Sequence, residues 1–274
     1  MKKSLIFVTI ALLGIMAGGC SKHHAHKKHG AKVGTTIEIN LSGVTRDTVA
    51  RNGDVLTDTL KNYVKVSIAN GAVVTLRDAY ILGINWEITP WAAITCEGDA
   101  TIILEGSNRL IPFHTTYPGI FVPVGNTLTI RGDGSLDVCG RYSAAIGAGN
   151  RMSCGNIIIK GGNITATGYE EYYYYDPFHG YGKYTRGGAG IGSAEYSDCG
   201  SITITGGTIC AKGGLSAPGI GCGEGGHCGN ITITSAVTSV LAAKGNDAPN
   251  SIGAGQDGTC DGIIIEDPSK VIQQ

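Results

Sequence analysis

Cysteine and histidine are the residues of this chain best suited to covalent or metal chemistry. The chain has nine cysteines, and four of them stand eight positions after an Ile-Gly pair. Thiols repeated in this way can stack unreacted, join as disulfides or bind a metal together with an imidazole. Cys222, His227 and Cys228 are metal-ligand types, but their spacing does not match C-x₂-C and no fourth ligand is evident. The pairs are Ile146 and Cys154, Ile191 and Cys199, Ile220 and Cys228, and Ile252 and Cys260.

Acidic residues are the second group that could do chemistry. Glycoside hydrolysis needs two carboxylates on opposite sides of one bond, and a calcium-dependent lyase needs a carboxylate cluster with a basic residue nearby. Glu195 and Glu224, each four positions before a repeated cysteine, come nearest to a stack, and we interpret them as polar turn residues. The sequence therefore predicts no catalytic residue, no metal and no cofactor, and calcium stays an alternative that no identifiable cluster supports. A lyase or hydrolase stays the less favoured alternative.

Tyrosine is the third group, and it is concentrated in one place. The stretch "YEEYYYYDPFHGYGKYTR", residues 169–186, holds seven of the twelve tyrosines, although only 7% of all residues are aromatic. Aromatic rings offer a flat apolar face with a polar tip. Since a sugar ring also has one comparatively apolar face, exposed tyrosines of this kind suit carbohydrate.

A repeat positions all of these residues. Apolar residues follow three and five places after each repeated cysteine, as in Ile202 and Ile204. Weaker copies extend the pattern towards the N-terminus, with Val74 and Leu76, Ile102 and Leu104, and Leu128 and Ile130 in the inward places. The cysteine place of each copy, called the frame position below, falls at 71, 99, 125, 154, 199, 228 and 260.

Each copy contains three short segments rich in Ile, Val and Thr, bounded by glycine pairs, which indicates strands and turns. Such turns bury an inward face only when they stack, about 4.8 Å apart, into parallel sheets. An antiparallel sandwich would show alternating hairpin signals instead. We therefore predict an all-β fold, a single-stranded right-handed parallel β-helix (solenoid) of about seven rungs over residues 35–274. "TTIEINLSG" should add an edge strand or a cap, and "EDPSKVIQQ" a polar cap.

The step between frame positions 154 and 199 is 45 residues instead of about 29, so residues 169–186 are an insertion in one turn. Counted from the frame, aromatic residues of earlier turns fall at the same corner. This predicts a carbohydrate-binding strip, with structural cover or a protein interface as alternatives. Its residues are Tyr172, Tyr173, Tyr174, Tyr175, Tyr181, Tyr184, Trp86, Tyr117 and Tyr142.

The N-terminus has the features of an export signal. Lys2 and Lys3 precede an apolar run that is too short for a comfortable membrane span. The run closes on "AGGC", which resembles the lipobox of bacterial lipoproteins. The resemblance implies a signal peptide over 1–19, lipidation of Cys20, and anchorage in the cell envelope, at the outer membrane or cell surface. Secretion without a lipid is the alternative.

Residues 20–34, rich in His and Lys, are expected to form a flexible tether. The formal net charge of −1 shows no basic bias. Nucleic acid is therefore not a predicted partner, and the membrane is contacted through the lipid alone.

The stacked "AAIGAG…CGNIIIKGGNITATG" units resemble bacterial cell-surface β-helix lipoproteins, and residues 62–140 are similar to carbohydrate-binding β-helix domains related to pectate lyases. That wider superfamily contains polysaccharide lyases, glycoside hydrolases and domains that bind polysaccharide without cleaving it. The resemblance implies an envelope protein, and we predict that it binds a polysaccharide or oligosaccharide without catalysis. A structural or adhesive protein with a protein partner is the alternative.

Overall fold

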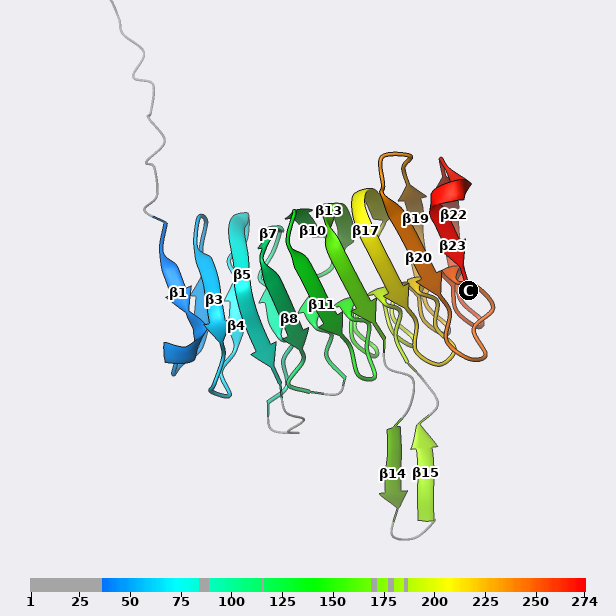
Figure 1. The fold of residues 1–274 in the computed structure, drawn as a ribbon. Helices are drawn as coiled ribbons and strands as arrows, with labels where there is room; N and C mark the ends of the chain where they lie inside the picture. The colour runs from blue at the N-terminus through cyan, green and yellow to red at the C-terminus, as the bar shows by residue number, and fades with distance from the viewer. Residues whose placement is uncertain (1–35, 84–88, 115, 169–171, 177–179, 185–186) are drawn as a thin grey trace, which may run out of the picture. The chain divides into compact units, whose positions relative to one another are not determined.

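Short β-strands, the elements predicted from the two-residue apolar period, build this protein (Figure 1). Two sheets of parallel strands run along the chain, so the predicted fold class, a parallel β-solenoid, is confirmed. The computed structural model describes residues 36–83, 89–114, 116–168, 172–176, 180–184 and 187–274, with the backbone alone for 172–176 and 180–184.

The larger sheet has thirteen strands, and nine of them form one path in which each strand pairs with that of the next turn. The path is β1 (Glu38–Asn40), β3 (Val55–Thr59), β5 (Ala72–Leu82), β7 (Ala100–Glu105), β10 (Thr127–Gly132), β13 (Asn156–Thr167), β17 (Ile202–Lys212), β19 (His227–Ile233) and β22 (Thr259–Ile265). Beside it lie β8 (Ser107–Ile111), β11 (Ser135–Cys139), β20 (Ser239–Ala243) and β23 (Val271–Gln273).

The second sheet has eight strands, which are β2 (Thr48–Ala50), β4 (Val66–Ile68), β6 (Ile94–Cys96), β9 (Ile120–Phe121), β12 (Ile146–Gly147), β16 (Ile191–Gly192), β18 (Ile220–Cys222) and β21 (Ile252–Ala254). A turn such as β7, β8 and β9 thus contains three strands, as predicted. Between β13 and β16 the chain forms an antiparallel pair, β14 (Tyr172–Asp176) and β15 (Gly180–Tyr184). Two 3₁₀ helices, η1 (Leu41–Gly43) and η2 (Pro268–Lys270), lie near the two ends of the described chain.

Stacked aliphatic side chains form the core. Ile157, Ile202 and Ile231 are register partners in three successive turns, and each has no exposed surface. Burial of one such side chain stabilises the fold by about 1.5–3 kcal/mol. The apolar residues predicted to face inward are buried in every repeat except the last, in the weaker repeats as well as the stronger ones.

The strand register corrects one predicted alignment. The frame positions placed Ile102 beside Leu128, whereas the strands pair Ile102 with Ile130 and Ala100 with Leu128. The step at this point is therefore 28 residues (130 − 102) rather than 26. Because side chains alternate with a period of two, a slip of two residues leaves the same side chains facing the core. The burial was predicted correctly for that reason.

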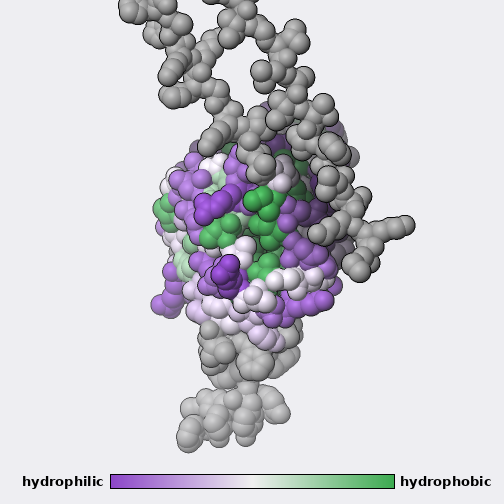
Figure 2. Space-filling view, turned by 90° about the vertical axis from the view of Figure 1, so that its left-hand side faces the viewer, coloured by the Kyte–Doolittle hydropathy of each residue, from purple (hydrophilic) through white to green (hydrophobic). Residues whose placement is uncertain are grey.

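The segments at the two ends of the solenoid extend it. "TTIEINLSG" supplies both an edge strand, β1, and a cap, because Leu41 of η1 is fully buried. The view onto this end shows apolar residues within a polar surround (Figure 2), and Ile37 is exposed there. "EDPSKVIQQ" does more than the predicted polar cap, since β23 pairs with β20. Ile263, whose register partner Ile231 is buried, is 46% exposed.

A column of four glycines lets the backbones of neighbouring turns approach closely. Gly147, Gly192, Gly221 and Gly253 are register partners in the second sheet, and each has a φ between +123° and +138°. A Cβ atom on any of the first three would overlap the carbonyl oxygen of the next glycine in the column. Side chains other than glycine rarely adopt this backbone conformation, so both the conformation and the space require glycine.

We predict that Gly192→Ala destabilises the protein by roughly 3 kcal/mol or more, because a strained backbone is combined with a clash against backbone. The midpoint of urea unfolding measures the effect. Gly125→Ala is the matched control, since Gly125 also has a positive φ, of 80°, but open space around it. The control should lose only about 1–2 kcal/mol, the cost of the left-handed backbone conformation alone. Equal losses in the two variants would show that the close approach is unimportant.

Candidate functional site

The loops that lead from the larger sheet into the second sheet lie together at one corner of the solenoid. In successive turns these loops are residues 60–65, 83–93, 112–119 and 140–145, and the insertion takes the same place in the next turn, within residues 168–190. We call this set of loops the aromatic corner. The predicted binding strip belongs to it.

Rings from three of these loops are in contact. Phe113 is buried and contacts Tyr63, with ring centroids 6.5 Å apart, and Trp91, at 6.1 Å. His114 stands edge-on to Tyr117 at 5.7 Å. Half of the Tyr63 surface is exposed, at 50%. Offset and edge-to-face ring pairs at such distances are favourable, so they help to hold the loops together.

Hydrogen bonds tie the later loops to the earlier ones. The Ser143 hydroxyl donates to the carbonyl oxygen of Tyr117 over 2.6 Å. Arg141 donates from Nη2 to the carbonyl oxygen of Gly83 over 3.4 Å. Of the predicted site residues, Tyr117 and Tyr142 are therefore on adjoining loops, and both are partly buried.

The remaining predicted site residues lie in or next to segments whose side chains are not described. Trp86 is outside the described residues. The six tyrosines of the insertion are in β14 and β15, where Tyr172 pairs with Tyr184 and Tyr175 with Tyr181. Their role in carbohydrate binding therefore stays a prediction.

The insertion leaves the solenoid and rejoins it at neighbouring points. Gly168 donates its N–H to the Lys212 carbonyl oxygen over 2.8 Å, and Gly187 donates to the Leu215 carbonyl oxygen over 3.0 Å. A Cβ on Gly168 would overlap the carbonyl oxygen of Gly188. The two ends of the insertion are thus fixed side by side at the corner.

Tyr63 and Trp91 were missed by the sequence reasoning. Tyr63, Trp91 and Tyr117 each stand three positions before a strand of the second sheet, and the strands that follow them are in register. The three residues thus hold equivalent places in successive turns, and we call them the aromatic column; counting back from the following strand would have found it. The indole N–H of Trp91 is buried and has no hydrogen-bond partner among the described residues.

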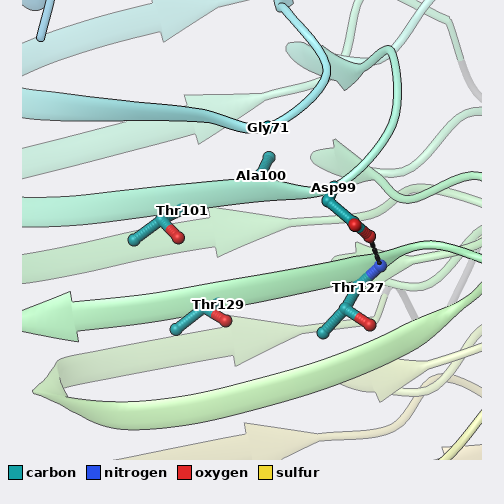
Figure 3. A pocket seen from close by; sticks show the side chains of 6 residues that line it. All are labelled: Gly71, Asp99, Ala100, Thr101, Thr127 and Thr129. Atoms are coloured by element: carbon teal, nitrogen blue, oxygen red, sulfur yellow. Dashed lines mark hydrogen bonds between the residues drawn. The ribbon is translucent and has the colours of Figure 1, made fainter. Parts of the chain in front are cut away.

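A shallow pocket of about 240 Å³ lies elsewhere, at the beginning of β7 and β10 (Figure 3). It contains none of the predicted site residues. Its carboxylate, Asp99, accepts a hydrogen bond from the backbone N–H of Thr127 over 2.7 Å. The lining is otherwise Gly71, Ala100, Thr101, Thr127 and Thr129.

Carboxylates of the turns serve mainly to join one turn to the next. Four aspartates accept a hydrogen bond from a backbone N–H of the following turn, over 2.7 to 2.9 Å. Glu195, interpreted as a polar turn residue, is buried and accepts from Asn150 over 3.1 Å. The aspartates and their partners are Asp47 with Lys65, Asp78 with Ser107, Asp99 with Thr127, and Asp198 with His227.

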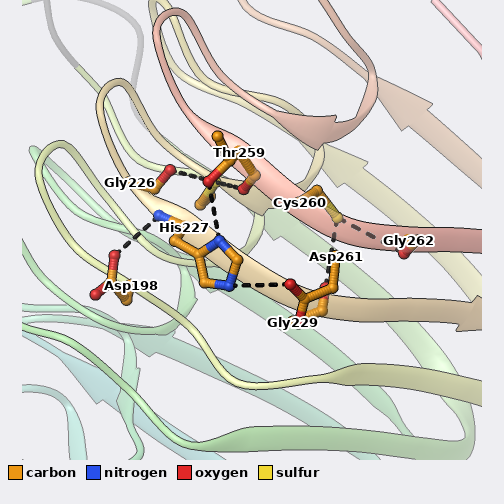
Figure 4. A network of polar contacts seen from close by, with 9 residues as sticks. Asp198, Gly226, His227, Gly229, Thr259, Cys260, Asp261 and Gly262 are labelled. Carbon is orange, nitrogen blue, oxygen red and sulfur yellow. Dashed lines mark hydrogen bonds and ion pairs between the residues drawn. The ribbon is translucent and has the colours of Figure 1, made fainter.

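A hydroxyl, an imidazole and a carboxylate lie in a row near the last turns (Figure 4). His227 Nδ1 is 2.9 Å from Thr259 Oγ1, and its Nε2 is 3.4 Å from Asp261 Oδ1. The side chains of His227 and Asp261 are 47% and 54% exposed. Because solvent weakens such contacts, we assign them to the linkage of β19 with β22. Within the described ranges, no group of three or more His, Cys, Asp or Glu side chains is arranged to hold a metal ion.

The four repeated cysteines form the predicted column. Cys199 pairs with Cys228 through the backbone, in an isolated parallel β-bridge. Cys228 is in turn the register partner of Cys260. Cys154, Cys199 and Cys228 are buried, Cys260 is partly buried, and all four are free thiols. The interpretation as stacked residues is thus confirmed.

Burial and thiol contacts raise the pKa values of several cysteines. Burial alone raises the pKa of Cys96 from its ordinary value of 9.0 to about 12. The neighbouring thiol of Cys154 is the chief cause of the raised pKa of Cys199, and the thiol of Cys199 has the same effect on Cys228. These groups are therefore protonated at neutral pH, and poor nucleophiles in the folded chain.

Neither protein-family models, nor curated proteins, nor solved structures match this chain. The class of this protein is given by its fold, which is a parallel β-solenoid. The predicted signal peptide, the predicted lipidation site Cys20 and the predicted tether of 20–34 lie outside the described residues. In the part of the chain that is described, no helix is long and apolar enough to cross a membrane.

We predict a loss of stability at alkaline pH that depends on Cys96. Its pKa in the folded protein is raised, so its contribution is present below pH 9.0 and is lost as the pH rises towards about 12. At pH 10, one unit above the ordinary value, the loss should be on the order of 1 kcal/mol. Urea unfolding at pH 8 and pH 10, compared between the parent and Cys96→Ala, measures it. An unchanged pH dependence in the variant would contradict the assignment.

Proposed function

We propose that this protein binds an extended polysaccharide or oligosaccharide at the aromatic corner and does not cleave it. The observation that carries the proposal is the coincidence of two features. The column of Tyr63, Trp91 and Tyr117 and the tyrosine-rich insertion belong to the same set of loops, in nearby turns.

The chemistry of the corner suits a chain of sugar rings. Five successive turns contribute loops, so that the rise of the solenoid gives a strip roughly 20 Å long. Aromatic side chains supply broad contact area at a low cost in conformational entropy. Arg141, whose guanidinium already bonds to the corner backbone, adds hydrogen-bond donors beside Tyr142.

Two observations favour binding over catalysis. Aspartates of the turns are engaged with backbone N–H groups of the next turn, which is a structural task. The pocket at β7 and β10 is shallow and contains a single carboxylate. Neither arrangement supplies the pair of opposed carboxylates that hydrolysis requires.

We further propose that the protein is exported and anchored in the cell envelope through a lipid on Cys20, which would present the corner to glycans outside the cytoplasm. The support is the "AGGC" boundary after an apolar run. We predict that the parent partitions into detergent and incorporates a labelled fatty acid, whereas Cys20→Ala does neither. A labelled Cys20→Ala variant would contradict lipidation at this residue.

We predict that the protein is retained on at least one insoluble polysaccharide, and that Tyr173→Ala with Tyr175→Ala weakens this retention. Two rings at about 1 kcal/mol each correspond to a Kd roughly thirtyfold higher. Because successive residues of a strand face opposite ways, Tyr172→Ala with Tyr174→Ala tests the other face of the hairpin. Tyr63→Ala tests the column in the described part of the corner.

Tyr196→Ala is the matched control, because Tyr196 is 48% exposed and lies in a turn before β17, away from the corner. Retention that survives all three corner variants would exclude the corner as the binding surface. Release of reducing sugar would identify a hydrolase, and release of an unsaturated product would identify a lyase. Retention of a protein instead of any glycan would favour the adhesive alternative.

A further inference from the structure

The shallow pocket at the beginning of β7 and β10 has no part in the proposed function. Its volume is about 240 Å³. Sites for drug-sized ligands measure about 300–1,000 Å³, so this pocket suits a ligand of a single ring. It lies where the chain enters the larger sheet, whereas the aromatic corner lies where the chain leaves that sheet. The pocket is therefore a separate place on the solenoid.

Two hydroxyls from neighbouring turns line the pocket. Thr101 of β7 and Thr129 of β10 are register partners. They alternate along their strands with the buried residues Ile102 and Ile130, so they face outwards. Neither hydroxyl has a hydrogen-bond partner among the residues that the structure describes. Because parallel strands lie about 4.8 Å apart, one small molecule can reach both hydroxyls.

A carboxylate stands beside the two hydroxyls. Asp99 accepts the backbone N–H of Thr127 through Oδ1 over 2.7 Å, which fixes the carboxylate in place. Its Oδ2 has no partner within the described part of the chain and is open to a ligand. Figure 3 shows the hydroxyl oxygens of Thr101 and Thr129 on the side that faces Asp99 and Thr127. Three polar groups of two kinds thus converge on one space.

The surroundings of these polar groups are aliphatic or open. In the column of the two threonines, the neighbours are Val73 on one side and Ile158 on the other, and both are partly buried. Gly71 precedes β5 as Asp99 precedes β7, and a Cβ atom on this glycine would meet nothing within 4 Å. Hydroxyls framed by aliphatic side chains suit a sugar ring, which has hydroxyl edges and one comparatively apolar face.

We propose that this pocket binds one neutral sugar residue, such as the end or a branch of a glycan. Oδ2 of Asp99 accepts hydrogen bonds from sugar hydroxyls, and the hydroxyls of Thr101 and Thr129 both donate and accept. An acidic sugar is disfavoured, because its carboxylate would meet the carboxylate of Asp99. The site does not depend on the aromatic corner and stands even if that corner binds nothing.

Titration of the full chain, isotope-labelled for NMR, with neutral methyl glycosides tests the proposal. The probes are the methyl glycosides of glucose, galactose, mannose, xylose and N-acetylglucosamine, with methyl galacturonoside as the acidic comparison. We expect at least one neutral glycoside to shift the backbone amide signals of Thr101, Thr127 and Thr129 in a saturable way. The acidic glycoside should bind more weakly than galactoside.

Variants of equal shape show whether the hydroxyls bind the sugar. Thr101→Val with Thr129→Val removes both hydroxyls and should raise the Kd roughly tenfold or more. Thr203→Val with Thr232→Val is the matched control, because these threonines are also partly buried register partners on the same face, but lie outside the pocket. The control should keep the Kd of the parent, and so should Tyr63→Ala at the aromatic corner.

Three results would overturn the proposal. The first is that no neutral glycoside shifts the amide signals of the pocket. The second is an equal Kd in the parent and in the pocket variant. The third is a shift caused by calcium chloride and by no glycoside, which would identify a cation site instead. Glycoside binding confined to the aromatic corner gives the first result here while supporting the proposed function, so the two proposals fail separately.

Discussion

Parallel stacking of one turn upon the next is the constraint on which the whole structure depends. Every turn bonds to its neighbours through its backbone at a fixed spacing of about 4.8 Å. A side chain at a given place therefore meets the side chain at the same place one turn away. Shape and polarity must match along each column, which explains the columns of isoleucine, cysteine and glycine.

The constraint is relaxed at the aromatic corner. Loops there differ in length from turn to turn, because they begin and end on paired strands but need not pair along their whole course. Rings that pack across loops replace backbone pairing, as Phe113 does between Tyr63 and Trp91. A surface that varies while its support stays constant is suited to recognition.

The strands could be predicted well from the sequence in those turns where the same residues recur at the same offsets. Ile-Gly and cysteine recur at equal offsets in the last four turns, so strands and inward residues could be identified there. In the earlier turns Val, Leu and Ala replace isoleucine, and the alignment of Ile102 slipped by two residues without changing which residues face inward.

The corner was harder to predict. Trp91 and Tyr63 escaped notice because counting from the frame position crosses loops of unequal length, whereas the distance to the following strand is constant.

The two ends of the insertion lie side by side at Gly168 and Gly188. The chain thus returns to the point at which it left, and β13 and β17, which precede and follow the insertion, still pair in parallel, with one irregularity at Lys160. The residues in between are free to change in number and kind without disturbing the core. Exchange of this one segment is therefore a route by which a solenoid of this type can acquire a new specificity while its turns keep their stability.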